Sequence, residues 1–453
     1  MPLNIAYIAA YLIRGGFDVE IWDFEVEEYS DSLLIKRVEN TQPCIIGLSA
    51  FTSTVLCADR LAGVVKNNFP HIRIAVGGVH VSALPHQSLK EFESFDCVVV
   101  GEGERTFLEF CQNTRDGKPV DNIDGLLIRG KDDFTPRKPI EDLDELPFPA
   151  RDLLNRKLYT GTVHKGFSRD YLNILEVFTA RGCPYECIFC ASNVTLGRKV
   201  RFRSISNICD EISEEIRKCK INHVTFLDDT LTLKPERIKK LCGYLKSNNL
   251  TWNATGTRVN TVTKELLQEM SECGCIGIAF GVESGSQRML DLMKKGITLK
   301  QVRDAFKWAK EAKVRSIEAD FIIGAHPDET VEDLELTRKL IKELKPDILS
   351  VAYITPYPKT EVSRLMKERN LIANSNDWGN FMLFSSKKPS WRTVNFSSDD
   401  LFNTQRRMLR NYYYTPGYIL RKISKMKNLN EFFYWAKSAI DFAKISIFSS
   451  NRN

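Results

Sequence analysis

Three cysteines in one short stretch carry the clearest chemical signal in the sequence. Cys183, Cys187 and Cys190 lie within Thr179–Cys190 with the spacing CxxxCxxC. Three thiolates can bind three irons of a [4Fe–4S] cubane, whereas four are needed to occupy every iron. The spacing therefore predicts a cluster with one open iron, to which an exogenous ligand can bind.

Two other interpretations of this triplet are a zinc site and three unrelated core cysteines. A structural zinc ion takes four protein ligands, and no histidine has a ligand-like spacing to the triplet. Gly182 before the first cysteine, Phe189 before the last and the apolar run that precedes them favour the cluster. The amine and carboxylate of S-adenosylmethionine (SAM) could chelate the open iron, and reduction of the sulfonium would release a 5′-deoxyadenosyl radical. The other nine cysteines form no second pattern of this kind and are predicted to be structural.

The elements around the triplet predict a barrel. Six apolar strand candidates, each followed by a helical run, lie at residues 174–178, 223–227, 251–255, 277–280, 317–323 and 348–354. Six such units predict a partial (β/α)6 barrel over residues 171–370, in which chemistry gathers at the carboxyl ends of the strands. Every polar motif of this region follows a strand in that way.

The triplet with Phe189 resembles the signature of the radical SAM superfamily, and the resemblance extends to about Thr360. It implies that Phe189 helps to hold adenine and that a polar motif after the second strand faces the methionine amine. The SAM contacts that it implies are Phe189, Asp228, Asp229, Arg258, Glu283, Ser284 and Gly324. Alternatively, Asp228 and Asp229 could cap a helix, and Glu283 could belong to a salt bridge of the barrel.

Residues 1–115 predict a second α/β unit. Strand-like runs at 18–22, 44–48, 73–76 and 97–100 alternate with helical segments, which is typical of a doubly wound, Rossmann-like domain. The chain begins on a helical run, residues 5–14, so the strand expected before it is absent. Residues 116–170, rich in Asp, Lys and Pro, are predicted to be a linker, and residues 371–453 a helical carboxy-terminal region.

Glycine-bearing and polar turns follow three of these strands. Glycines at such turns let the backbone approach a ligand closely, although neither turn matches the GxGxxG fingerprint of dinucleotide-binding domains. The region resembles the cobalamin-binding domain fused to one class of radical SAM enzymes. The residues predicted to contact cobalamin are Ser49, Thr52, Gly77, Gly78, His80, Glu102 and Gly103. The opening strand and a DxHxxG motif are absent, so the motif nominates no histidine as the lower cobalt ligand. His80 is a tempting ligand by its position, and the alternative is a turn histidine bonded to backbone.

Composition excludes several classes of function. The net charge of +6 is small for 453 residues and predicts no nucleic-acid partner. No run of eighteen apolar residues predicts a membrane span, and the amino terminus does not resemble a signal peptide, so we expect a cytoplasmic protein. The aromatic and basic tail, including Tyr412–Tyr414 and 418–426, is predicted to cap the barrel. A membrane-surface helix is the alternative.

The resemblance implies a cobalamin-dependent radical SAM C-methyltransferase acting on a small molecule, with flavodoxin or ferredoxin as electron donor. One SAM would generate the radical, and a second would remethylate cobalt. The alternatives are a non-methylating cyclisation, rearrangement or oxidation, and a degenerate cofactor-binding scaffold. Hydrogen abstraction needs no general acid or base, so no catalytic side chain is assigned. We expect the substrate to enter between the two domains, where the tail around Tyr412 to Tyr418 could close the space.

Overall fold

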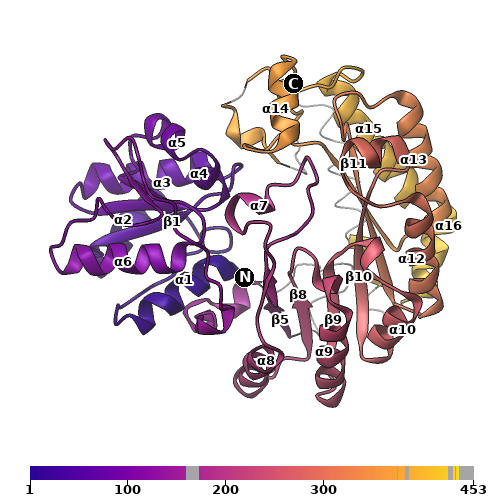
Figure 1. Ribbon diagram of the computed structural model, residues 1–453, viewed down its shortest axis with the longest axis horizontal. Helices are drawn as coiled ribbons and strands as arrows, with labels where there is room; N and C mark the ends of the chain where they lie inside the picture. The colour runs from indigo at the N-terminus through magenta and orange to yellow at the C-terminus, as the bar shows by residue number, and fades with distance from the viewer. Residues whose placement is uncertain (160–172, 375, 383–386, 427–431, 434, 438–453) are drawn as a thin grey trace.

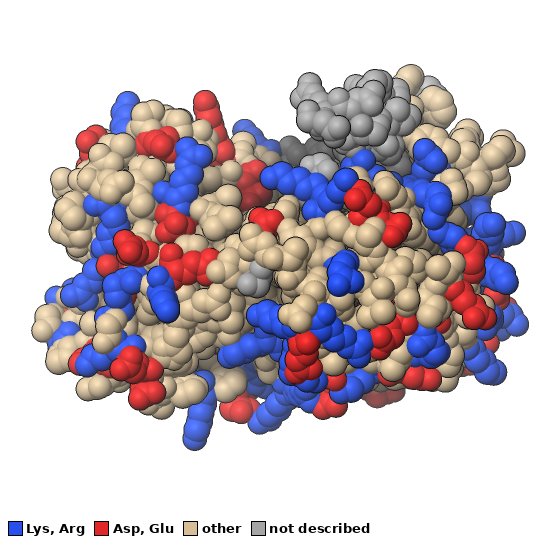
Figure 2. Space-filling model, turned by 90° about the horizontal axis from the view of Figure 1, so that it is seen from above, with Lys and Arg blue, Asp and Glu red and all other residues tan. Residues whose placement is uncertain are grey.

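The computed structural model describes residues 1–159, 173–374, 376–382, 387–426, 432–433 and 435–437. Two α/β units, which we call the first unit (residues 1–128) and the second unit (residues 173–368), lie side by side, and the carboxy-terminal helices pack on the outside of the second (Figure 1). Figure 2 shows acidic and basic side chains interspersed over the face seen from above, without one continuous basic surface.

The first unit is built on a sheet of order β1-β2-β3-β4. Parallel strands β1 (Ile45–Ser49), β2 (Arg73–Gly77) and β3 (Cys97–Val99) correspond to three of the predicted strands. Their helices are α1 (Leu3–Arg14), α2 (Asp31–Thr41), α3 (Val55–Asn68), α4 (Val79–Ala83), α5 (Pro85–Glu91) and α6 (Gly103–Arg115). Antiparallel β4 (Leu126–Ile128) lies in the stretch predicted to be a linker, because its short apolar run pairs with β3.

The strand predicted at residues 18–22 does not form. A strand needs a neighbour to receive its amide and carbonyl groups, and none of the described strands pairs with this segment. The apolar side chain of Ile21 is still buried, in a cluster with Ala6 and Ala9 of α1 and with Leu154. The alternation of apolar residues at 18–22 is therefore explained by the burial of Ile21 and not by strand pairing.

The described part of the segment between the units, residues 129–159, contains the 3-10 helices η1 (Leu143–Glu145), η2 (Arg151–Leu153) and η3 (Arg156–Tyr159). Arg151 fixes it to the second unit, because its buried guanidinium donates to the backbone carbonyl of Glu176 (2.7 Å) and to the carboxylate of Glu211 (2.5 Å). The linker is thus packed between the units.

The second unit has the predicted six parallel strands, in the order β12-β11-β10-β9-β8-β5. They are β5 (Ile174–Val177), β8 (His223–Phe226), β9 (Thr251–Thr257), β10 (Cys275–Glu283), β11 (Ser316–Ile323) and β12 (Ile348–Tyr353). Its helices are α8 (Ile205–Cys219), α9 (Pro235–Ser247), α10 (Lys264–Glu272), α11 (Gln287–Leu292), α12 (Leu299–Glu311), α13 (Val331–Leu344) and α14 (Glu361–Glu368), with η5 (Leu231–Leu233) and η6 (Val259–Thr261). The barrel is only partial, because β5 and β12, the two edge strands of this sheet, do not pair with each other.

The carboxy-terminal region contains η7 (Trp378–Asn380), α15 (Ser398–Tyr413) and α16 (Pro416–Ser424). The hydroxyl of Tyr413 bonds the backbone of Leu349 (2.8 Å), and that of Tyr418 donates to the carbonyl of Asp347 (3.1 Å). These contacts support the predicted cap. They lie at the amino end of β12, however, so the expectation that these tyrosines close the space between the units is wrong.

The outer face of α16 keeps Leu420 exposed. Within the described part of the chain, no helix combines the length and apolar character needed to cross a bilayer.

Candidate functional site

The cysteine triplet lies in a loop at the carboxyl edge of the barrel. The chain leaves β5, forms β6 (Ala180–Arg181), passes through the loop of residues 182–200, which we call the cluster loop, and returns in β7 (Arg201–Phe202). Within this loop lies α7 (Ser192–Thr195). Gly182 begins the loop with a φ of +97°, and a Cβ atom there would lie 2.5 Å from the carbonyl oxygen of Lys199. The glycine before the first cysteine is therefore required by close backbone packing.

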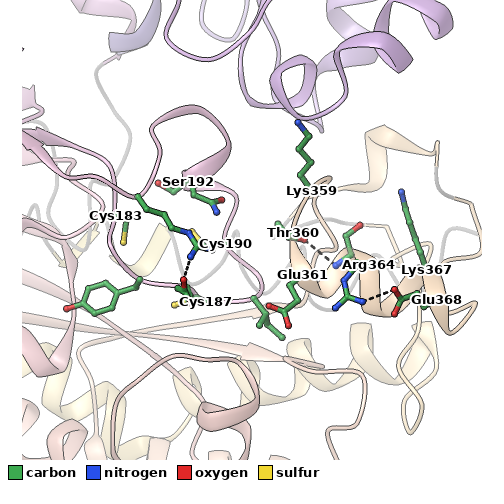
Figure 3. A pocket seen from close by; sticks show the side chains of 16 residues that line it. Cys183, Cys187, Cys190, Ser192, Lys359, Thr360, Glu361, Arg364, Lys367 and Glu368 are labelled. Carbon is green, nitrogen blue, oxygen red and sulfur yellow. Dashed lines mark hydrogen bonds and ion pairs between the residues drawn. The ribbon is translucent and has the colours of Figure 1, made fainter. Parts of the chain in front are cut away.

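Cys183, Cys187 and Cys190 border one cavity of about 740 Å³, together with residues of α14 (Figure 3). The three are free thiols, and Cys190 is exposed. Burial of its sulfur raises the pKa of Cys190 to about 11, and the neighbouring Asp229, Cys187 and Cys183 raise it further. The three sulfurs are thus close enough to interact electrostatically.

This donor set fits a cubane better than a zinc ion. Within the described residues, no group of three or more His, Cys, Asp or Glu side chains is arranged to hold a metal ion by itself. A zinc ion needs ligands that converge on one point, whereas the thiolates of a cubane bind different irons and stand farther apart. Three free thiols that border one cavity without converging on one point suit the different irons of a cubane.

Asp228, after β8, is turned toward the start of the cluster loop. Its carboxylate accepts the backbone amides of Thr179 (2.8 Å) and Ala180 (2.6 Å) and the hydroxyl of Thr179 (3.0 Å). Burial raises the pKa of Asp228 to about 6, although these three bonds oppose the shift. The exposed Asp229 accepts from the Ser192 hydroxyl (2.5 Å). Asp228 therefore ties two strand ends together.

Arg258, after β9, contacts the middle of the cluster loop. Its guanidinium lies 3.5 Å from the ring centroid of Tyr185, and Nη1 approaches the sulfur of Cys187 at 3.6 Å. The backbone carbonyl of Lys295 holds the other end of the group. A cation beside a ligand sulfur attracts the anionic thiolate that binds metal.

Glu283, at the end of β10, forms a buried ion pair with Lys295 (2.7 Å). It has a φ of +69° beside a register shift in the strand. The Lys295 ammonium also lies 5.9 Å from the ring centroid of Phe189, so the pair adjoins the predicted adenine contact. Ser284 lies apart from these residues, fully buried with its hydroxyl against Thr337 of α13 (3.3 Å).

Gly324 follows β11 with a φ of +65°, and an added Cβ would lie 2.8 Å from Leu401. Its backbone amide donates to Glu329, a carboxylate that is almost wholly buried. Burial raises the pKa of Glu329 to about 8 against the effect of the amides of Gly324 and Ala325. Glu329 therefore holds the turn at Gly324, which follows β11 and was predicted to contact SAM.

Three loops form the carboxyl edge of the first unit, and we call them the first-unit edge: residues 49–54, 77–80 and 100–104. Gly78 has a φ of +107°, and a Cβ there would lie 2.5 Å from the carbonyl of Ala50, so the first two loops pack tightly. Ser49 accepts from the side chain of Asn4 (2.8 Å), Thr52 is buried, and Phe51 is 58% exposed. An exposed aromatic beside polar loops offers a flat apolar surface to a large cofactor.

His80 belongs to the first-unit edge, but its side chain is buried. Its ring packs on Trp378 (4.8 Å between centroids) and Phe92 (6.4 Å), and only 1% of the residue is exposed. Burial lowers the pKa of His80 to about 4, and its Nδ1 has no hydrogen-bond partner. The alternative to a cobalt ligand was a His80 ring bonded to backbone, and Nδ1 makes no such hydrogen bond to any described residue.

The side chain of Glu102 points toward the base of the cluster loop, where it meets Arg181 of β6 (3.1 Å) and Arg201 of β7 (2.8 Å). Gly103 starts α6 against α1, because an added Cβ would lie 3.2 Å from Ile8. The structure therefore brings Asp229, Arg258 and Glu283 close to the cluster loop, which contains Phe189, and it directs Asp228, Ser284, His80 and Glu102 to other partners.

Sequence reasoning missed several residues of this region: Arg181, Arg201, Tyr185, Lys295, Glu329 and Trp378. Arg181 and Tyr185 lie inside the cysteine motif and could have been noticed there. The others are ordinary residues whose partners are distant in sequence, so no local pattern marks them.

Two family models match the chain. A model described as the Radical SAM superfamily matches residues 177–341, and one described as a B12 binding domain matches residues 1–110. The first match falls on the second unit and includes the cluster loop. The second falls on the first unit and includes its edge.

Individual proteins are similar over most of the chain. An uncharacterized methyltransferase of Pyrococcus horikoshii is 33% identical over 427 residues, covering 93% of this chain and 90% of the relative. The anaerobic magnesium-protoporphyrin IX monomethyl ester cyclase of Rubrivivax gelatinosus is 29% identical over 373 residues, 80% of this chain and 65% of the cyclase. The solved structure of the cobalamin-dependent S-adenosylmethionine radical enzyme OxsB, with aqua-cobalamin and S-adenosylmethionine bound, matches with a TM-score of 0.75 at 19% identity. That match covers 98% of this chain and 69% of OxsB, and it concerns the fold.

Proposed function

Because the chain belongs to the radical SAM superfamily, in the class that carries an amino-terminal cobalamin-binding domain, we propose that it methylates an unactivated carbon of a small molecule. One observation carries the proposal. Three free cysteines border one cavity at the carboxyl edge of the barrel, in a loop whose base the first unit holds through Glu102. When bound, the cluster and SAM supply hydrogen abstraction, and cobalamin supplies the methyl group.

We assign roles to the chain's own residues as part of this proposal. Cys183, Cys187 and Cys190 would hold the cluster, and Arg258 would orient Cys187 and Tyr185. Phe189 would hold adenine, beside the Glu283–Lys295 pair.

At the first-unit edge, Ser49 and Gly77 would face cobalamin, together with Phe51, which sequence reasoning did not select. Their partial exposure supports this assignment. Thr52, Gly78 and Gly103 would instead shape the loops, because each is buried or closely packed. His80 would serve packing instead of cobalt, because its ring is enclosed by Trp378 and Phe92.

An electron donor such as flavodoxin or ferredoxin would reduce the cluster from the side of α14. The exposure of Lys359 and Lys367 around the cavity supports that route, since these lysines suit an acidic partner (Figure 3).

The experiment uses the full chain with its cluster reconstituted without oxygen, an excess of a chemical reductant such as dithionite for the cluster, reduced cobalamin, and SAM labelled in the methyl group. We expect 5′-deoxyadenosine to form, and the labelled methyl group to appear in the corrin fraction by mass spectrometry, before any substrate is known. Similarity to a cyclase favours one alternative, a non-methylating reaction. 5′-Deoxyadenosine without label on cobalamin would support that alternative. Neither product from cluster-loaded, SAM-bound protein would indicate a scaffold.

A further inference from the structure

The base of the cluster loop brings two positive charges together. The loop is closed by β6 and β7, a two-stranded antiparallel pair in which Arg181 lies directly opposite Arg201. Like charges at facing positions of an antiparallel pair destabilise it. The two strands contain only four residues, so they have little other pairing energy. The base of the loop therefore needs an anion.

The first unit supplies that anion from its own loop after β3. One oxygen of Glu102 accepts from Arg181 (3.1 Å) and Arg201 (2.9 Å), and the other accepts from Arg201 (2.8 Å) and the backbone amide of Ile140 (2.9 Å). Glu104 adds a bond of 2.6 Å to Arg181. The side chains are 12% exposed for Arg181, 3% for Arg201, 6% for Glu102 and 5% for Glu104. We call these four residues the clasp.

The charges of the clasp depend on one another. Burial raises the pKa of Glu102, but the bonds from Arg201, the charge of Arg181 and the amide of Ile140 outweigh it, so that the pKa lies below its usual value. The carboxylate is therefore anionic at neutral pH. Removing one partner of a buried ion pair leaves an uncompensated charge, which costs far more than loss of an exposed pair.

The clasp continues into the first-unit edge. The amide of Gly101, next to Glu102, donates to the hydroxyl of Ser82 in α4 (3.0 Å). The same helix begins after Gly78, which packs on the carbonyl of Ala50. One contiguous set of contacts thus runs from the loops predicted to face cobalamin to the base of the cluster loop.

We propose that Glu102 and Glu104 are positioning residues that hold the base of the cluster loop from the first unit, so that cobalamin on the first-unit edge steadies the cluster loop. The inference rests on the proposed function for the identity of that ligand. Beyond that function, the inference couples cobalamin binding on the first unit to the order of the cluster loop on the second unit.

The test is hydrogen–deuterium exchange of the full chain, read in peptides that span residues 179–203. The variants are Glu102→Gln and Glu104→Gln. Glu141→Gln is the matched control, because Glu141 also pairs with the cluster loop, at Lys199 (2.5 Å), but in solvent. A glutamine keeps the shape of Glu102 but turns an NH2 group toward two hydrogen-bond donors. We therefore expect hydrogen–deuterium exchange at residues 179–203 to be at least about tenfold faster in E102Q, because the loss of one charge-assisted hydrogen bond changes an equilibrium by about that factor. E104Q should show a smaller increase, and E141Q none.

The second arm adds hydroxocobalamin and follows its binding by absorbance. In the natural protein, bound cobalamin should slow exchange at residues 179–203, and in E102Q it should bind without slowing it. Unchanged exchange in E102Q, or equal acceleration in E141Q, would overturn the proposal. So would cobalamin that binds the natural protein without any effect on the loop. If circular dichroism shows that E102Q is unfolded, E104Q decides by the same criteria.

These measurements need no turnover, so their outcome is separate from that of the proposed function. Methyl transfer with an unresponsive loop would refute the clasp alone. A responsive loop without 5′-deoxyadenosine would refute the proposed reaction alone.

Discussion

Asp228 offers a direct test of how the barrel holds the cluster loop. Its buried carboxylate receives the amides of Thr179 and Ala180 and the hydroxyl of Thr179. We predict that Asp228→Ala damages both folding and cluster binding, whereas Asp228→Asn is tolerated. Asparagine retains an oxygen for the two amides, and its NH2 group can donate to the threonine hydroxyl, which also accepts hydrogen bonds.

The size of the effect follows from the contacts. A pKa of about 6 in place of 3.8 means that burial disfavours the charged form of Asp228 by about 3 kcal/mol despite its bonds. Asparagine carries no charge and avoids this cost. Alanine leaves two buried amides without acceptors, at about 1–3 kcal/mol each, or roughly 2–6 kcal/mol in all. At about 2–4 °C for each kcal/mol, the Tm of Asp228→Ala should fall by at least about 4 °C.

The assay is thermal unfolding followed by circular dichroism, together with iron content after anaerobic reconstitution. Asp229→Asn is the control, because that exposed side chain has one bond, to Ser192. We expect low iron and a lowered Tm in Asp228→Ala alone. Equal loss of iron in Asp228→Asn would show that the negative charge itself is required, as in a direct contact with SAM, and would refute this reasoning.

Three further predictions concern other parts of the chain. Cys187→Ala should abolish the visible absorbance and paramagnetic signal of the cluster, whereas Cys273→Ala, which changes a buried cysteine elsewhere in the barrel, should retain them; equal spectra would refute the ligand assignment. The pKa of Glu329, raised by burial to about 8 from 4.5, means that its contribution to stability is full below pH 4.5 and is lost as the pH rises toward 8. Glu329→Gln should flatten that decline, worth a few kcal/mol, in unfolding measured from pH 5 to 8. A parallel decline in the variant would contradict the assignment. Trp378→Ala should destabilise the first unit by about 3–5 kcal/mol, since the indole is buried on His80 and donates to Glu91 (2.7 Å), and Trp378→Phe should cost less. Limited proteolysis of residues 77–92 would measure it, and equal resistance in Trp378→Ala would exclude the packing role.

The sequence predicted well what depends on local pattern. The six barrel strands were recognisable because each apolar run is short, is followed by a helix and ends in polar residues. The cysteine triplet was recognisable because its ligands are seven residues apart at most. The fold class, the superfamily and the cofactors [4Fe–4S], SAM and cobalamin are confirmed.

What could not be predicted depends on pairs that are distant in the chain. Asp228 was assigned to SAM because it ends a strand, but its partners lie 48 and 49 residues earlier. Glu102 was assigned to cobalamin because glycines flank it, but its partners follow 79 and 99 residues later. His80 looked like a cobalt ligand because it follows two glycines, and Trp378, nearly 300 residues away, encloses it. A local motif places a side chain at an edge, and tertiary packing decides which way it points.

The cluster loop shows why these distant pairs matter for function. Asp228 holds the approach to the loop through backbone amides, Glu102 and Glu104 hold its base through arginines, and Arg258 contacts its middle at Tyr185 and Cys187. The first two contacts involve no ligand sulfur, so they order the loop whether or not iron is bound. Of these three contacts, that of Arg258 reaches a cysteine sulfur, and the attraction of its positive charge strengthens when that sulfur becomes an anionic ligand. The contacts that order the loop are therefore made by other residues than the contact that would support the cluster electrostatically.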